Sequence, residues 1–354
     1  RLLLLCVYLG ASAVYMISAS EDSVFAGGLK AVLLSCFCVM LFDYYMSSGK
    51  MKELKLFCLF SLLFYLMGST VSMLLFGGQV EEIKRAVSEG GQNAALGNFG
   101  TFYSAVFVLG GSLFLLFSAK GKIRFLGLFG VIISVFLLFY GQFTLSIMLS
   151  VFLLILLTVN VLCKPKPVVW IALFAITAIV FLLLLQDISQ LLLSLSNIVP
   201  QGYISERLSD MASFIREDNS FHSAARIDLY YGDFMNFLNY PLTGTLAPKA
   251  VGMNVTLLAG GHSSMLGLFA NYGIVVAVCF LLFFFYPYKK IWKLWEGHAY
   301  RRYLTPMLFI FLLLSFVNPT FNVQTLCFVM MMIIPSLPLL TMKADDMPRC
   351  LSKF

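Results

Sequence analysis

The sequence predicts an all-α polytopic membrane protein with about ten transmembrane helices and one large loop. Of its 354 residues, 60% are hydrophobic and 12% are charged, whereas soluble domains carry about 25% charged residues. Apolar runs of roughly 20 residues recur along the chain, which is the length a helix needs to cross about 30 Å of hydrocarbon. One long polar segment, Gln186 to His262, separates two groups of these runs.

Ten apolar runs are long enough to be read as spans. They are approximately Leu2 to Ser18, Leu29 to Ser48, Leu54 to Phe76, Phe99 to Ser118, Ile123 to Tyr140, Phe143 to Cys163, Val168 to Leu185, Ser263 to Tyr286, Tyr303 to Asn318 and Phe321 to Thr341. This divides the chain into seven spans with short loops (1–185), a large loop (186–262), and three spans with a C-terminal tail (263–354).

The distribution of Lys and Arg predicts the orientation. Every even-numbered span is followed by a basic cluster, and the odd-numbered spans are followed by acidic or polar connections. The basic clusters contain Lys50, Lys52 and Lys55; Lys120, Lys122 and Arg124; Lys164 and Lys166; Lys289, Lys290, Lys293, Arg301 and Arg302; and Lys343, Arg349 and Lys353. Because cytoplasmic loops are the basic ones, both termini are expected in the cytoplasm and the large loop outside. The net charge of +7 therefore reports topology, and no nucleic-acid partner is expected.

Three features of the N-terminal half each allow two interpretations. The first run resembles a signal peptide, since Ala11-Ser12-Ala13 follows Leu2 to Leu5, but it continues to Ile17 and a retained helix is favoured. Asp43 lies inside the second span, where acids are usually functional; its place near the cytoplasmic end favours snorkelling to the interface. The loop Gly77 to Asn98 is either a surface helix or a wall of the site.

Cysteine and acid spacing predicts no metal site. None of the eight cysteines falls in the large loop, and no CxxC pair occurs. We interpret them as small apolar side chains packed between helices. The acids of the loop are scattered, so neither a metal nor another cofactor is expected.

A helix is predicted in the large loop from Ser223 to Pro241. Its apolar stripe is Ile227, Tyr230 or Tyr231, Phe234 and Leu238. Arg226, Tyr230 and Asp233 recur at i, i+4 and i+7 and share one face. This face either binds a ligand or is the solvated side of a helix that rests on the membrane.

The sequence Gly260-Gly261-His262-Ser263 opens the eighth span. The positive end of a helix dipole disfavours a protonated imidazole, so His262 is expected to be neutral and able to act as a general base. The free N–H groups of such a helix start, with Gly261 allowing close approach, suit an anion such as phosphate. An interface histidine that caps the helix is the alternative.

Several cations accompany this histidine in the loop. Arg207, Arg216 and Arg226 could neutralise a lipid-linked diphosphate as it leaves, and Lys249 lies in the connection before His262. Because arginine does not deprotonate, it can hold developing negative charge without joining the proton transfer.

These motifs resemble the O-antigen polymerase and ligase superfamily of bacterial inner membranes. The pieces that carry the resemblance are Glu206-Arg207-Leu208, Arg226, Pro241-Leu242-Thr243-Gly244, Gly261-His262-Ser263-Ser264 and Asn271-Tyr272-Gly273. The resemblance implies a GT-C-like fold, a large periplasmic loop, and metal-independent, inverting transfer of a glycan from undecaprenyl diphosphate in lipopolysaccharide biosynthesis. Two departures stand out: Thr144-Leu145-Ser146 lacks an expected arginine, and Thr245 replaces a second glycine after Gly244.

The resemblance also implies roles for residues. Arg207 and Arg226 would bind the diphosphate, and His262 would be the catalytic base or would position the acceptor. The expected substrate-binding residues are Tyr230, Asp233, Arg216, Gly261, Ser263 and Lys249. For the missing mid-chain arginine, Lys84, Arg85 and Arg216 are the candidates.

We therefore expect a polymerase that joins undecaprenyl-diphosphate-linked repeat units at an outward site. The alternative within the superfamily is a ligase that hands the glycan to lipid A core. A lipid-linked sugar transporter or flippase would favour charges and Gly or Pro breaks within the spans, of which Gly110-Gly111 is the clearest instance; a membrane scaffold is the third class. Expected partners are the lipid-linked oligosaccharide donor and acceptor, the lipid bilayer and a chain-length regulator protein.

Overall fold

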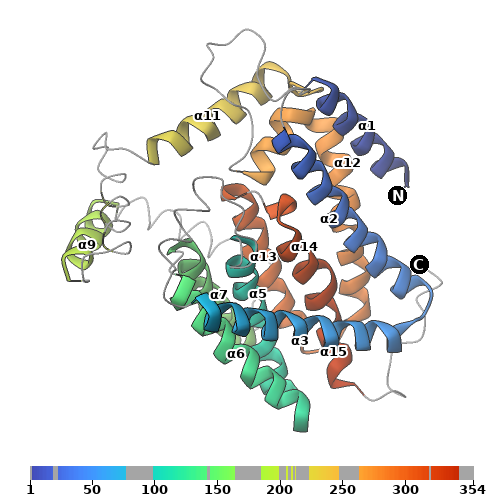
Figure 1. Cartoon of the computed structure of the whole chain (residues 1–354), viewed down its shortest axis with the longest axis vertical. Coiled ribbons are helices and arrows are strands. Elements are labelled where there is room, and N and C mark those ends of the chain that lie inside the picture. Colours follow the sequence, from blue (N-terminus) through green and yellow to red (C-terminus); the bar gives the residue numbers. More distant parts are fainter. Residues whose placement is uncertain are drawn as a thin grey trace.

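The computed structural model describes residues 2–18, 23–76, 99–141, 144–163, 185–198, 205, 209, 212, 223–246, 263–318 and 320–342. Within these ranges every regular element is a helix (Figure 1). They are α1 (Leu2–Ser18), α2 (Ser23–Ser47), α3 (Met51–Phe76), α5 (Phe99–Ser118), α6 (Gly121–Gly141), α7 (Thr144–Cys163), α9 (Leu185–Ile198), α11 (Ser223–Asn239), α12 (Ser264–Leu294), α13 (Arg301–Val317), η2 (Thr320–Asn322), α14 (Gln324–Phe328), η3 (Val329–Ile333) and α15 (Ile334–Thr341). The predicted class, an all-α membrane protein, is confirmed.

Six helices of the described part are long and apolar enough to cross a membrane. They are Met51–Leu74, Gly100–Ser118, Gly121–Phe139, Leu145–Leu162, Ser264–Leu294 and Gln324–Thr341, the last formed by α14, η3 and α15 together. α1, α2 and α13 also fall on predicted spans. The predicted seventh span lies outside the described residues except for Leu185, so the count of ten and the GT-C-like arrangement stay predictions.

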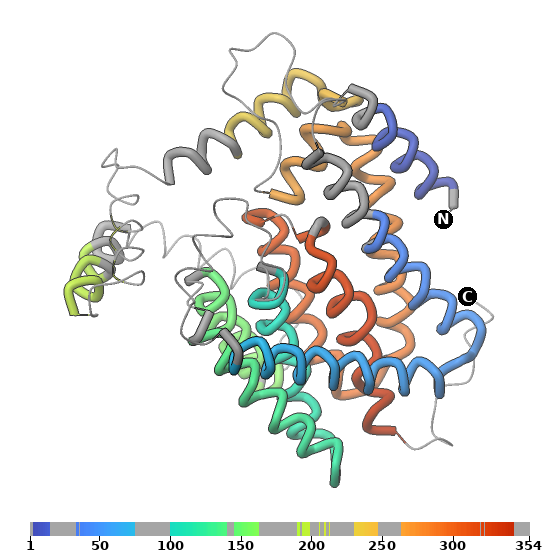
Figure 2. Tube along the Cα trace, in the orientation of Figure 1, coloured from blue at the N-terminus to red at the C-terminus, as the bar shows by residue number. Residues whose placement is uncertain are grey.

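The surface of the bundle is apolar, as a lipid environment requires. Phe64, Phe125 and Phe139 are each at least 70% exposed, which would be unfavourable in water. The centre is formed by α5 and by the segment from α14 to α15, which are buried along most of their length and lie inside the ring of other helices (Figure 1). Figure 2 shows α9 standing apart from this bundle.

The C-terminal span is irregular because two prolines interrupt its hydrogen bonds. In η3 the N–H of Ile334 donates to the carbonyl of Val329, five residues earlier, and Pro335 cannot donate the next bond of this register. The hydroxyl of Tyr288 replaces this missing donor: it donates to the backbone carbonyl of Met330 at 2.6 Å. Likewise Pro338 leaves the carbonyl of Ile334 without its helical donor, and the hydroxyl of Tyr300 takes that place.

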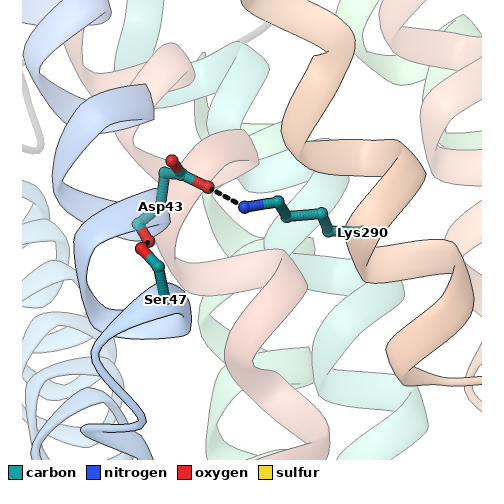
Figure 3. A network of polar contacts seen from close by, with 3 residues as sticks. All are labelled: Asp43, Ser47 and Lys290. Carbon is teal, nitrogen blue, oxygen red and sulfur yellow. Dashed lines mark hydrogen bonds and ion pairs between the residues drawn. The ribbon is translucent and has the colours of Figure 1, made fainter. Parts of the chain in front are cut away.

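The connections predicted to be cytoplasmic meet at one end of the bundle. The ammonium of Lys290 in α12 pairs with the carboxylate of Asp43 in α2 at 2.8 Å (Figure 3). Lys55 at the start of α3 donates to the carbonyl of Met342 after α15 at 2.6 Å, and Asn160 near the end of α7 donates to Arg302 in α13 at 2.6 Å. These contacts join basic connections that are far apart in the sequence, whereas the predicted alternation and the assignment of the two ends to cytoplasm and periplasm stay predictions.

Asp43 does more than snorkel, which was the favoured reading of the sequence. Its side chain is about three-quarters buried and its partner Lys290 is more buried still. The hydroxyl of Ser47, one turn later, donates to the backbone carbonyl of Asp43 (Figure 3). The acid is thus neutralised by a second helix, because a lone carboxylate at this depth would be costly to desolvate.

Candidate functional site

The candidate site lies at the opposite end of the bundle, where α12 begins. Ser263 caps α12: its Oγ accepts from the N–H of Leu266 at 3.0 Å. The N–H of Ser264 donates to the carbonyl of Asn318 after α13 at 3.1 Å. The hydroxyl of Ser264 accepts from the N–H of Phe321 at 3.0 Å. The point at which the chain leaves His262 is therefore fixed against the end of α13.

Helix α11 lies at this end of the molecule, beside the first turns of α12 (Figure 1), and part of its polar face is buried. Asp233 and Asn236 are 2% and 1% exposed. The hydroxyl of Tyr230 donates to the carbonyl of Val317, the last residue of α13, at 2.9 Å. The ring of Phe237 contacts that of Phe269 in α12, with centroids 5.7 Å apart. The buried side of α11 thus packs on both α12 and α13.

The apolar stripe of α11 points the other way. Tyr231 and Leu238 are 57% and 53% exposed, and Phe234 is 49% exposed. The predicted helix is confirmed. Of its predicted stripe, Tyr231, Phe234 and Leu238 share an exposed side, and the side chain of Ile227 is outside the described part. The alternative of a solvated charged face is wrong for Asp233, which is 2% exposed.

Residues 241–246, which follow α11, dock on a break in α12. At Gly273 the chain has φ 69° and ψ 174°, so two helices meet there at a kink. The N–H of Thr245 donates to the carbonyl of Ala270 and that of Leu246 to Asn271, both at 2.9 Å. In return the N–H of Ile274 donates to the carbonyl of Pro241 at 2.8 Å. The loop thereby satisfies backbone groups that the kink leaves open.

The predicted eighth span, Ser263 to Tyr286, falls on α12, which is long and apolar enough to cross a membrane, and the break at Gly273 is a feature that the sequence did not predict. The part after the break, Ile274 to Leu294, is roughly 20 residues long and alone covers about 30 Å. The part before it, Ser264 to Tyr272, is therefore an additional short helix at the end that carries the candidate site. Hydropathy did not detect the break because the sequence from Ser264 to Leu294 is strongly apolar on average, despite Asn271.

Two motif pieces that are separate in the sequence are in contact here. A Cβ on Gly244 would lie 2.4 Å from the carbonyl carbon of Asn271 and the nitrogen of Tyr272. A Cβ on Gly273 would lie 2.3 Å from the carbonyl oxygen of Leu242. Thr245, the departure from the expected second glycine, has no positive φ and uses its N–H in the docking bond to Ala270. A second glycine is therefore not required by this geometry.

The structure places some of the predicted site residues and not others. Tyr230, Asp233 and Ser263 lie at the same end of the bundle, on α11 and at the start of α12. Arg226 is on α11, one turn before Tyr230, and its side chain is outside the described part. Arg207, Arg216, Lys249, Gly261 and His262 are outside the described residues, as is the whole loop Gly77 to Asn98 with Lys84 and Arg85.

Sequence reasoning missed Asn236 and did not assign a role to Asn271. Neither amide atom of Asn236 has a hydrogen-bond partner in the described part of the chain, and the same is true of Oδ1 of Asn271, which is also buried. The available signal was spacing, because Asn236 lies three residues after Asp233 on the same face. Among the described residues no three His, Cys, Asp or Glu side chains gather as a metal site would require.

No protein-family model matches the chain, and no curated protein is significantly similar to it. The motifs, the topology and the geometry of this end of the bundle are therefore the features that bear on function.

Proposed function

We propose that the protein is a membrane glycosyltransferase of the O-antigen polymerase type, which joins undecaprenyl-diphosphate-linked repeat units. The observation that carries the proposal is the buried polar face of α11. Tyr230 and Asp233 face the ends of α12 and α13, at the point where the chain passes from His262 into α12. Burial of a carboxylate carries a desolvation cost, so its place at this end, where the predicted site residues gather, supports a binding role.

In the proposed reaction the hydroxyl of the acceptor sugar attacks the anomeric carbon of the donor glycan. His262 removes the hydroxyl proton, the new glycosidic bond forms, and the bond from the anomeric carbon to the diphosphate oxygen breaks. Arg207 and Arg226 hold the departing diphosphate, with Arg216 and Lys249 adding positive charge. A single displacement of this kind inverts the anomeric configuration.

The helix start at Ser263 has a defined part in this scheme. Its capping bond to Leu266 and the anchoring of Ser264 on Asn318 and Phe321 hold the backbone that follows Gly261 and His262. A rigid attachment of this kind keeps a general base within reach of its substrate. The site is proposed to face the periplasm of a bacterial inner membrane, in a GT-C-like bundle that needs no metal.

A second candidate, a flippase for lipid-linked sugar, is favoured by one observation. The break in α12 at Gly273 divides a membrane helix, and discontinuous helices form the substrate sites of many transporters. A ligase that uses lipid A core as its acceptor would employ the same residues as the polymerase and differ in acceptor alone.

The test is an assay of purified protein in nanodiscs with lipid-linked repeat units extracted from the producing strain. We expect a ladder of glycan polymers that is lost in His262→Ala and Arg226→Ala and kept in the matched controls His298→Ala and Arg124→Ala. The control residues lie near the opposite end of the bundle, and Arg124 is exposed. A wild-type protein that makes no ladder, or a ladder that survives His262→Ala, would overturn the proposal. Transfer of repeat units across liposomes without a ladder would instead establish the flippase.

A further inference from the structure

Two asparagine side chains, one on α11 and one on α12, stand out because they carry polar atoms that are buried and unpaired in the described part of the chain. For Asn236 these are both Nδ2 and Oδ1, and for Asn271 the unpaired buried atom is Oδ1. Asn236 is 1% exposed. Buried amide groups in folded proteins are nearly always hydrogen-bonded, so each exception calls for a partner.

The two residues belong to one place in the fold. Asn236 directly precedes Phe237, whose ring contacts Phe269, and Asn271 follows Phe269 by two residues. The docked loop connects them as well. The carbonyl of Asn271 accepts from Leu246, and the peptide after Asn271 touches Gly244. The backbone of Asn271 therefore meets the loop that follows α11 at the break in α12, and Asn236 lies on the helix that packs beside it, one residue from the Phe237–Phe269 contact.

We propose that Asn236 and Asn271 bind hydroxyl groups of the acceptor sugar, an inference that rests on the function proposed above. An amide offers both a donor and an acceptor without formal charge, which suits a sugar hydroxyl, because a hydroxyl also donates and accepts. A diphosphate would instead require cations. The carboxylate of Asp233, one turn before Asn236, adds an acceptor to the same buried face of α11.

Movement of α11 away from α12 is the proposed route by which a sugar reaches these atoms. α11 is joined to α12 through the loop 241–246, which is held by the reciprocal bonds of Thr245, Leu246 and Ile274. Separation of α11 from α12 would open the space between Phe237 and Phe269 without breaking the membrane-spanning part of α12. The amides are thus covered in the ligand-free protein and are uncovered when the acceptor enters.

The discriminating variants are Asn236→Leu and Asn271→Leu, alone and combined. Leucine has a similar size and removes unpaired polar groups, so the ligand-free melting temperature should stay equal or rise. Acceptor binding should weaken, and KM for the acceptor should rise about tenfold or more with a smaller change in kcat, since about 1.4 kcal/mol corresponds to a factor of ten. Asn239→Leu is the matched control, because Asn239 is exposed on the same helix.

A binding measurement separates this proposal from the proposed function. The probes are the repeat-unit oligosaccharide released from its lipid by mild acid, and undecaprenyl diphosphate without sugar, each added to the protein in nanodiscs. We expect the oligosaccharide to raise the melting temperature of wild type and of Asn239→Leu but not of the Asn236→Leu/Asn271→Leu double variant. Undecaprenyl diphosphate should affect all three equally.

Three results would overturn the proposal: no shift of wild type with the oligosaccharide, the same shift in the double variant, or a fall in the ligand-free melting temperature of the double variant. The last result would assign the amides to structural hydrogen bonds. Failure of the polymerase function is recognised separately by the absence of a ladder, whatever the oligosaccharide does.

Discussion

Gly244 and Gly273 interlock at the end of the bundle that carries the candidate site. Both have positive φ, 66° and 69°, and a side chain on either would collide with the backbone beside the other. The Cβ position of Gly244 lies 2.4 Å from the Asn271–Tyr272 peptide, and that of Gly273 lies 2.6 Å from the nitrogen of Gly244. This contact fixes the loop after α11 onto the break in α12, so the geometry of the site depends on two residues without side chains.

Gly273→Ala and Gly244→Ala should therefore destabilise the protein more than positive φ alone requires. Gly297 is the matched control, because its φ is 77° and nothing lies within 4 Å of its Cβ position. A left-handed alanine costs about 1–2 kcal/mol, and a backbone collision that forces the loop away should add roughly 1–3 kcal/mol. Thermal unfolding in nanodiscs, followed by tryptophan fluorescence, measures the difference. Equal losses of stability for Gly273→Ala and Gly297→Ala would show that the loop 241–246 moves aside without an energetic cost.

Tyr300 should be stabilising through a single hydrogen bond. Its hydroxyl donates to the buried carbonyl of Ile334, which Pro338 deprives of its helical donor. Tyr300→Phe should cost about 1–3 kcal/mol, the penalty for an unsatisfied buried group.

The second step of this test is Pro338→Ala in the Tyr300→Phe background. Alanine restores the N–H at 338, so the double variant should regain most of the lost stability. Tyr303→Phe is the control, since Tyr303 is partly exposed at the start of α13. If Pro338→Ala gives no rescue, the Ile334 carbonyl is not what Tyr300 stabilises.

The pair Asp43 and Lys290 should show strong coupling in a double-mutant cycle. Asp43→Asn removes the carboxylate that pairs with the largely buried ammonium of Lys290. Lys290→Met removes that ammonium and keeps the carboxylate of Asp43. Each single variant should lose about 1–3 kcal/mol, less than a fully buried pair because both groups keep some exposure. The double variant should lose less than the sum, with a coupling above about 0.5 kcal/mol. Additive losses would mean that the contact contributes no net stability.

The parts of the fold that the sequence predicted are those decided by transfer to lipid. Spans such as Phe99 to Ser118 follow from hydrophobic length alone, and the observed α5 has the same bounds. The position of Lys55, Lys290 and Arg302 in connections of the same predicted side follows from the clustering of cations along the sequence. These signals depend on composition over many residues, so one misplaced side chain does not change them.

The parts that were missed depend on single residues and on contacts between helices. The orientation of α11 could not be read from its amphipathicity, because Phe234 and Leu238 face outward while Asp233 and Asn236 are buried. The break in α12 depends on Gly273 meeting a loop about thirty residues earlier in the chain, and periodicity within one helix carries no information on such a contact. Asn236 was missed for the same reason, since only packing against α12 buries it.

His298 makes the stability of the turn between α12 and α13 depend on pH. Its ring lies against Trp295 and Phe114, its Nδ1 accepts from the N–H of Tyr300 at 3.1 Å, and burial lowers the pKa of His298 below its ordinary value of 6.5. The unfolded chain therefore binds a proton more readily than the folded protein does. Stability should be full above pH 6.5 and should fall as the pH drops from there through the lowered pKa of the folded state.

The variant His298→Asn tests this dependence, because asparagine keeps a hydrogen-bond acceptor near the position of Nδ1 and does not titrate. The wild-type melting temperature should fall between pH 7.5 and pH 5, and the fall should be smaller in His298→Asn. His222→Asn is the matched control and should keep the wild-type slope. A slope unchanged in His298→Asn would assign the pH dependence to other groups. A melting temperature that rises with acidification only in the wild type would mean that protonated His298 is favoured in the folded state, because it would then bind its proton more tightly than the unfolded chain does.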